Sequence, residues 1–191
     1  MQFRTLATGL LLSFALAGPV VAALADELSE VTRLHHAGQS AAALARADRY
    51  LATKPKDAQM RFLKSVVLAD TGRGSEAIAL LQQMVQDYPE LAEPHNNLAA
   101  LHAAAGDYGK ARTELEETLR LNPAFAPAQE NLGDIHAMLA SQAYAKALRL
   151  EPASATLPRK IALVRQITTP AGKVAPALPT ASASAAARLS N

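Results

Sequence analysis

The sequence has 191 residues, of which 50% are hydrophobic, 19% are charged and only 4% are aromatic. It contains 43 Ala residues, no Cys and no Trp, and its 19 Lys and Arg side chains nearly balance 17 Asp and Glu side chains. Abundant Ala with few aromatic residues favours an all-α chain. The lack of Cys excludes disulfides, thiolate metal sites and Cys nucleophiles, and the near-zero net charge gives little support to nucleic-acid binding.

Residues 1–25 have the layout of a secretory signal peptide. Arg4 supplies an early positive charge, residues 6–17 are apolar and uncharged, and Ala23 and Ala25 place small residues where a signal peptidase reads the chain. The apolar stretch is short for a membrane span, although an uncleaved anchor and a buried first helix are the alternatives. Cleavage after Ala25 predicts an exported, periplasmic protein. Membrane contact is expected only if the segment stays uncleaved, and then only through this segment.

A 34-residue period runs through the middle of the chain. Three residue types recur at this interval: Gly38, Gly72 and Gly106; Ala43, Ala77 and Ala111; and Pro55, Pro89 and Pro123. Each unit is predicted to be two helices joined by a turn at the Gly, which adopts positive φ without steric cost. The Ala lies on the second helix, where a small side chain allows close approach to the first, and the Pro ends the unit.

The period and its residues resemble the tetratricopeptide repeat (TPR) family. The best match comprises Asn-Leu-Ala at residues 97–99, Ala-Gly-Asp-Tyr at 105–108 and Leu-Asn-Pro at 121–123. The resemblance implies an all-α, right-handed α-solenoid of helix-turn-helix units. Three full repeats, residues 26–57, 58–91 and 92–125, are followed by a shortened fourth repeat, residues 126–152.

The fourth repeat is shortened, since Pro152 follows Pro123 by only 29 residues. Its turn Gly is absent, because no Gly or Pro lies between Gly133 and Pro152. Either residues 126–150 form one helix or a tight turn lies at Ala140 and Ser141. An unbroken stripe of apolar residues at helical spacing favours the single helix.

The C-terminal part of the sequence divides into a helix and a tail. A capping helix is predicted within residues 153–168, with Leu157, Ile161, Val164 and Ile167 on one face. Residues 169–191 are rich in Ala, Pro and Ser and are predicted to be disordered. Residues 153–191 carry five basic side chains and no acidic one. These charges could contact an anionic surface or the acidic body of the chain, or they could only make this end soluble. Because five charges are spread over 39 residues, the second interpretation is favoured.

Catalytic and metal-binding patterns are weak in this sequence. The five His residues show no HExxH spacing, and Gly72-Arg73-Gly74 lies at a predicted helix turn, not after a strand. No nucleophile, base and orienting group are assembled by spacing, so we expect no enzyme activity, metal or other cofactor. A His-dependent hydrolase or metal enzyme is the alternative of that class.

The TPR resemblance implies that the first helix of each repeat lines a concave groove. Carried over position by position, the groove residues are Leu28, Thr32, His35, Phe62, Val66, Asp70, Asn96, Ala100, Ala103, Glu130, Asp134 and Met138. This groove would be apolar at Phe62 and Val66 and acidic at Glu130 and Asp134, which suits an apolar and basic peptide or helix. Phe62 and Val66 have an alternative role in packing against the neighbouring repeat.

These observations predict a non-catalytic protein-interaction scaffold or adaptor of the cell envelope. Its partner is a protein or peptide, and nucleic acid is not expected. The alternative is a membrane-proximal assembly factor of a secretion or pilus machine.

Overall fold

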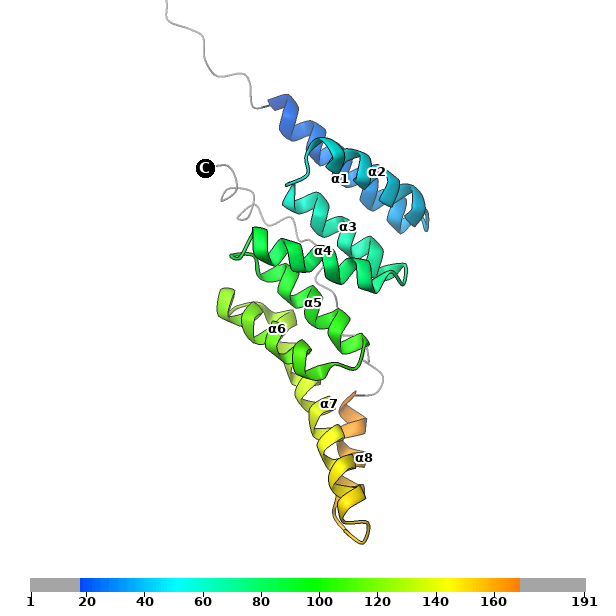
Figure 1. Ribbon diagram of the computed structural model, residues 1–191, viewed down its shortest axis with the longest axis vertical. Coiled ribbons are helices and arrows are strands. Elements are labelled where there is room, and N and C mark those ends of the chain that lie inside the picture. Colours follow the sequence, from blue (N-terminus) through cyan, green and yellow to red (C-terminus); the bar gives the residue numbers. More distant parts are fainter. Residues whose placement is uncertain (1–17, 169–191) are drawn as a thin grey trace, which may run out of the picture.

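Eight helices and no strand occur in residues 18–168, the part of the chain that the computed structural model describes. The helices are α1 (Gly18–His36), α2 (Ser40–Thr53), α3 (Ala58–Asp70), α4 (Gly74–Asp87), α5 (Ala92–Ala104), α6 (Tyr108–Leu121), α7 (Ala126–Leu150) and α8 (Leu157–Thr168). Each helix packs against the next, and the pairs stack along the long axis of the molecule (Figure 1). The predicted all-α solenoid is confirmed.

The predicted signal peptide overlaps α1. Its apolar stretch, residues 6–17, lies outside the described residues, as does the predicted tail, residues 169–191. Residues 18–25 form the first turns of α1, so the predicted boundary at residue 26 falls inside a helix of the full-length chain. Within residues 18–168, no helix combines the length and apolar character that crossing a bilayer requires.

Tight turns at Gly join the two helices of each of the first three units. Gly38, Gly72 and Gly106 have φ angles of 73°, 77° and 78°. The N–H that follows each Gly donates to a carbonyl five residues earlier, as Gln39 does to Leu34 at 2.9 Å. These bonds satisfy carbonyls at the helix end that would otherwise lack a partner. The predicted need for positive φ at these three positions is therefore confirmed.

Small buried residues hold the helix pairs close together. Ala43, Ala77 and Ala111 have no exposed surface, which agrees with their predicted role. Around them, buried side chains form three clusters that overlap along the array, one over α1–α4, one over α3–α5 and one over α5–α7. The core is therefore a continuous strip in which each unit depends on its neighbours.

The fourth unit is one continuous helix, α7, followed by the antiparallel α8. No turn interrupts Ala126–Leu150, so the single-helix interpretation is correct. The α7–α8 pair projects from the stacked units as a narrow finger (Figure 1). α8 buries Ile161, which is 9% exposed, but Ile167 is 64% exposed. The predicted common face is therefore wrong for Ile167, because the six residues that separate it from Ile161 rotate it by about 120° around the helix.

We expect Gly72→Ala to lower the free energy of unfolding by about 1–2 kcal/mol, because only φ strain opposes the new methyl group. No atom lies within 4 Å of the Cβ that would be added at Gly72. Gly133 is the matched control, since its Cβ would also meet open space but its φ is not positive and it lies within α7. Gly133→Ala should raise the free energy of unfolding by roughly 0.5–1 kcal/mol. Urea unfolding followed by circular dichroism measures both, and equal effects of the two changes would contradict the turn assignment.

Candidate protein-interaction surface

The twelve predicted groove residues all lie on α1, α3, α5 and α7, the first helices of the four units. Nine of them are partly or fully exposed, and we call these nine the first-helix surface: Leu28, Thr32, His35, Asp70, Ala100, Ala103, Glu130, Asp134 and Met138. The other three, Phe62, Val66 and Asn96, are buried.

Phe62 and Val66 belong to the core, not to an accessible groove. They are 6% and 3% exposed and cluster with Leu81 and Met84 of α4 and Leu98 of α5. The prediction that they form the apolar part of a binding groove is therefore wrong, and the alternative of packing against the neighbouring repeat is correct. The physical reason is that the next unit lies directly on this face of α3.

Asn96 is also a core residue, because its side chain is fully buried at a junction between units. Its Oδ1 accepts a hydrogen bond from Nδ2 of Asn131 on α7 at 3.1 Å, and its Nδ2 donates to Oδ1 of Asn97 at 3.4 Å. Buried amides are stable only with such partners. Asn96 therefore joins α5 to α7 and is not accessible to a ligand.

His35 and Asp70 join the ends of α1 and α3. The His35 Nε2 lies 2.9 Å from Asp70 Oδ2, and its Nδ1 lies 3.2 Å from the hydroxyl of Ser40, the first residue of α2. His35 is 16% exposed and Asp70 is 48% exposed. The imidazole thus ties three helices together, while part of the Asp70 carboxylate remains open to solvent.

Glu130 and Asp134 form an acidic pair on α7, one turn apart. Glu130 is exposed and Asp134 is partly buried. Neither carboxylate has a hydrogen bond or ion pair to any residue that the structure describes. Like charges at this spacing repel by roughly 0.2–0.5 kcal/mol. This end of the first-helix surface therefore carries uncompensated negative charge.

Small side chains border the acidic pair. The bond between Asn96 and Asn131 places this part of α7 beside α5. The following turns of α5 carry Ala100 and Ala103, both partly exposed. Both side chains are short, and Ala103 packs against the core cluster that contains Ile135 of α7.

The remaining predicted residues of the first-helix surface, Leu28, Thr32 and Met138, offer no free polar group for binding a ligand. The Thr32 hydroxyl already donates to the Leu28 carbonyl at 2.8 Å. Leu28 packs against the first core cluster, and Met138 is partly buried on α7. These side chains contribute shape and apolar area, not unsatisfied polar groups.

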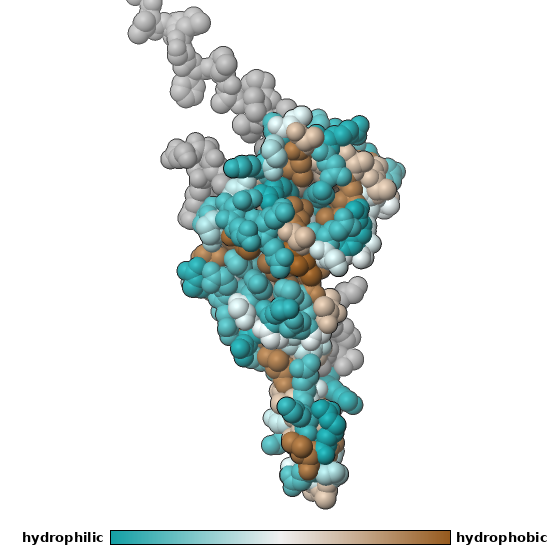
Figure 2. Space-filling view, viewed as in Figure 1, coloured by the Kyte–Doolittle hydropathy of each residue, from teal (hydrophilic) through white to brown (hydrophobic). Residues whose placement is uncertain are grey.

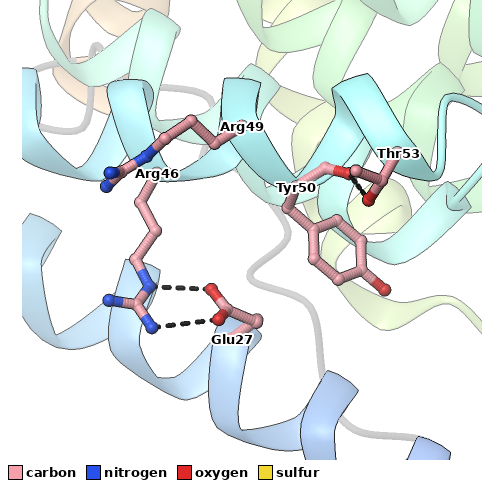
Figure 3. Close-up of a pocket in the computed structure, with 5 residues that line it drawn as sticks. All are labelled: Glu27, Arg46, Arg49, Tyr50 and Thr53. Atoms are coloured by element: carbon pink, nitrogen blue, oxygen red, sulfur yellow. Dashed lines mark hydrogen bonds and ion pairs between the residues drawn. The ribbon is translucent and has the colours of Figure 1, made fainter.

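A pocket of about 370 Å³ opens between α1 and α2, lined by Glu27, Arg46, Arg49, Tyr50 and Thr53 (Figure 3). Arg46 donates two hydrogen bonds to Glu27, at 2.7 and 3.0 Å, and the Thr53 hydroxyl donates to the Tyr50 carbonyl at 2.9 Å. Burial, followed by the nearby Asp57 carboxylate, raises the pKa of Tyr50 to about 12. The phenol therefore stays protonated near neutral pH.

The sequence analysis missed this pocket because four of its five lining residues lie on a second helix, at the first end of the array. Their spacing on α2, residues 46, 49, 50 and 53, is the signal that was available, since it defines one helix face. Within the described chain, Arg49 has no hydrogen bond or ion pair, whereas Arg46 is already paired. The pocket thus offers one uncommitted guanidinium and no nucleophile with a base.

His95 is a structural residue, with its Nδ1 2.7 Å from Glu114 Oε2 across α5 and α6. In the part of the chain that the structure describes, no three His, Asp or Glu side chains gather in a way that could hold a metal ion.

The 34-residue helix pairs, their positive-φ Gly turns and their buried Ala residues coincide with two family matches. Models described as tetratricopeptide repeat match residues 30–92 and residues 68–139. The chain is a tetratricopeptide repeat protein. The matched residues extend from α1 to α7 and include all three Gly turns.

Solved TPR structures share the fold of this chain. TTC0263, a thermophilic TPR protein of Thermus thermophilus, is 21% identical with a TM-score of 0.56, covering 75% of this chain and 82% of its own. A MamA protein is 18% identical with a TM-score of 0.55, covering 74% and 80%. An O-GlcNAc transferase mutant of Thermobaculum terrenum is 23% identical with a TM-score of 0.56, covering 66% of this chain but only 24% of its own. At these identities the likeness shows the fold alone, and a search of curated proteins gave no significant match.

TPR arrays generally act as protein-interaction scaffolds and are generally not catalytic, and this chain has their architecture. The visible face of the array in Figure 2 is mainly hydrophilic, with apolar atoms where stacked helix pairs meet. A TPR partner would therefore meet mostly polar side chains on this face.

Because Asn96 is buried and bonded, Asn96→Ala should act on stability. We expect the free energy of unfolding to fall by about 1–3 kcal/mol, since the buried hydrogen bond between Asn131 Nδ2 and Asn96 Oδ1 is lost. Gln83→Ala, at an exposed position of α4, is the control and should change little. Urea unfolding of the three proteins measures the difference. If Asn96→Ala unfolds like the wild type, the amide contact does not stabilise the array.

Proposed function

We propose that this TPR protein is an exported, non-catalytic adaptor of the cell envelope that binds a basic and partly apolar peptide or helix on its first-helix surface. The observation that carries this proposal is the uncompensated carboxylate pair, Glu130 and Asp134. A pair of repelling charges with no internal counter-ion costs stability and becomes favourable when a cationic ligand binds.

The surroundings of the acidic pair suit such a ligand. Ala100 and Ala103 are short, partly exposed apolar side chains on the neighbouring helix, and the half-exposed carboxylate of Asp70 adds negative charge further along the first-helix surface. The apolar part of this surface is not where the sequence predicted it, because Phe62 and Val66 are buried. The accessible apolar atoms belong to Leu28, Met138 and the Ala residues. We therefore expect a basic ligand with small apolar side chains, not one with a large aromatic anchor.

Export is supported by the N-terminal sequence. Arg4, the apolar residues 6–17 and the small residues Ala23 and Ala25 fit a signal peptide. The ion pair between Glu27 and Arg46 lies just beyond the proposed cleavage site. Cleavage after Ala25 would preserve this pair and leave Asp26 and Glu27 in the first turn of α1, where acidic side chains are favoured.

The export proposal predicts that the mature protein begins at Asp26. Edman sequencing or intact-mass measurement of protein recovered from the envelope tests this directly. An intact N-terminus would contradict cleavage and favour the alternative of an anchored, membrane-proximal assembly factor. An N-terminus at Asp26 would exclude anchoring of the mature protein through residues 1–25.

The partner can be identified by in-cell photocrosslinking from a position next to the first-helix surface. A photoreactive residue at Ala104, which is exposed at the end of α5, is expected to capture one reproducible protein. The same residue at Ala79, exposed on α4, is the positional control and should not capture that protein.

Charge dependence decides whether the captured protein binds as proposed. Combining the Ala104 probe with Glu130→Gln and Asp134→Asn should lower the crosslink yield at least about tenfold, because two charge-assisted contacts are lost. Glu90→Gln with Glu116→Gln removes two negative charges elsewhere and should leave the yield unchanged. Equal yields from both double variants, with native circular dichroism, would show that the acidic pair does not bind the partner.

A further inference from the structure

A second exposed surface lies on the projecting finger, where large apolar side chains occur beside basic ones. Leu163 and Ile167 of α8 are 53% and 64% exposed, and Leu150 at the end of α7 is 82% exposed. They are the exposed large hydrophobic residues of the described chain. Figure 2 shows apolar atoms among hydrophilic ones at this projecting end. The finger therefore differs from the rest of the described surface in exposing large apolar side chains.

The exposed stripe of α8 is distinct from the face that packs on α7. Ile161 is buried against α7, whereas Leu163 and Ile167 follow each other by four residues and share another face. Within residues 18–168, no following repeat covers this stripe, because the finger stands away from the stacked units (Figure 1). Packing within the described chain thus accounts for one face of α8 and not for the other.

Two basic side chains of α8 flank the exposed stripe, because Arg159 and Lys160 lie within about 60° of it around the helix. Lys160 precedes Leu163 by one turn, and its Nζ lies 5.5 Å from the centre of the Tyr144 ring. Arg165 lies on the opposite side of α8, and Arg149 is in the last turn of α7. From residue 152 to residue 191 the sequence contains no Asp or Glu. Residues 26–152 carry 13 basic and 17 acidic side chains, so positive charge is concentrated at this end.

We propose that the outer face of α8 binds an anionic lipid surface, with Leu163 and Ile167 entering the interfacial region and the flanking Arg and Lys side chains contacting lipid headgroups. Amphipathic helices with apolar side chains between cations lie in the plane of such interfaces. A convex helix on a projecting finger fits a planar bilayer better than a bound peptide, which needs a groove. The charge complementarity gives selectivity for anionic over zwitterionic lipid.

Tryptophan fluorescence tests the contact at one position, because the natural chain contains no Trp. In full-length Leu163→Trp, vesicles of equal parts phosphatidylcholine and phosphatidylglycerol should shift the emission to shorter wavelength. Vesicles of phosphatidylcholine alone should not shift it. Ala79→Trp, exposed on α4, is the positional control and should show no shift with either vesicle. A probe at residue 163 also separates α8 from the apolar residues 6–17, which could bind lipid independently.

Charge variants test the basic part of the proposal. Arg159→Gln with Lys160→Gln, introduced into Leu163→Trp, should weaken partition into the anionic vesicles roughly tenfold or more. Lys110→Gln with Arg112→Gln removes two basic charges from α6 and should have little effect. Circular dichroism confirms that each variant is folded.

Three results would overturn the proposal. The first is an unchanged emission of Leu163→Trp with anionic vesicles. The second is an equal shift for Ala79→Trp, which would indicate nonspecific adsorption. The third is a shift produced by soluble polyglutamate but not by vesicles, which would assign the surface to an acidic protein.

Discussion

Close approach of the two helices within each unit is the constraint on which the array depends. Ala43, Ala77 and Ala111 occupy equivalent positions with no exposed surface, and a larger side chain at any of them would push the helices apart. The Gly turns also keep the two helices of a unit close, because positive φ lets the connecting segment reverse the chain within a few residues. The overlapping core clusters then transmit this spacing from each pair to the next.

The 34-residue register predicted the turns, the helix pairs and the buried Ala residues because these depend on local sequence. It could not separate accessible from buried positions on the first helices, because that depends on how far the next unit leans over them. Phe62 and Asn96 show the difference, since equivalent positions in successive units are both covered, by an apolar cluster in one case and an amide contact in the other. The contact between His35 and Asp70 likewise depends on the distance between neighbouring units.

Polar groups at the junctions divide into those that are satisfied and those that are not. Asn96 with Asn131 and His95 with Glu114 are matched pairs that hold helices in place. Glu130 and Asp134 repel each other and have no partner within the described residues. This contrast, and not residue type, is the basis for proposing that the acidic pair binds a ligand, because all of these are polar side chains on or beside the first helices.

The uninterrupted α7 has a mechanical consequence. It contributes Glu130 and Asp134 to the array and then continues without a Gly, a Pro or a turn to Leu150, where the finger ends. The 16 residues from Asp134 to Leu150 correspond to about 24 Å of rigid helix. The helix is therefore a stiff spacer, and any object held at the acidic pair keeps a fixed distance and orientation relative to the tip of the finger. A hairpin with a turn, as in the preceding units, would reverse the chain before it reached that distance.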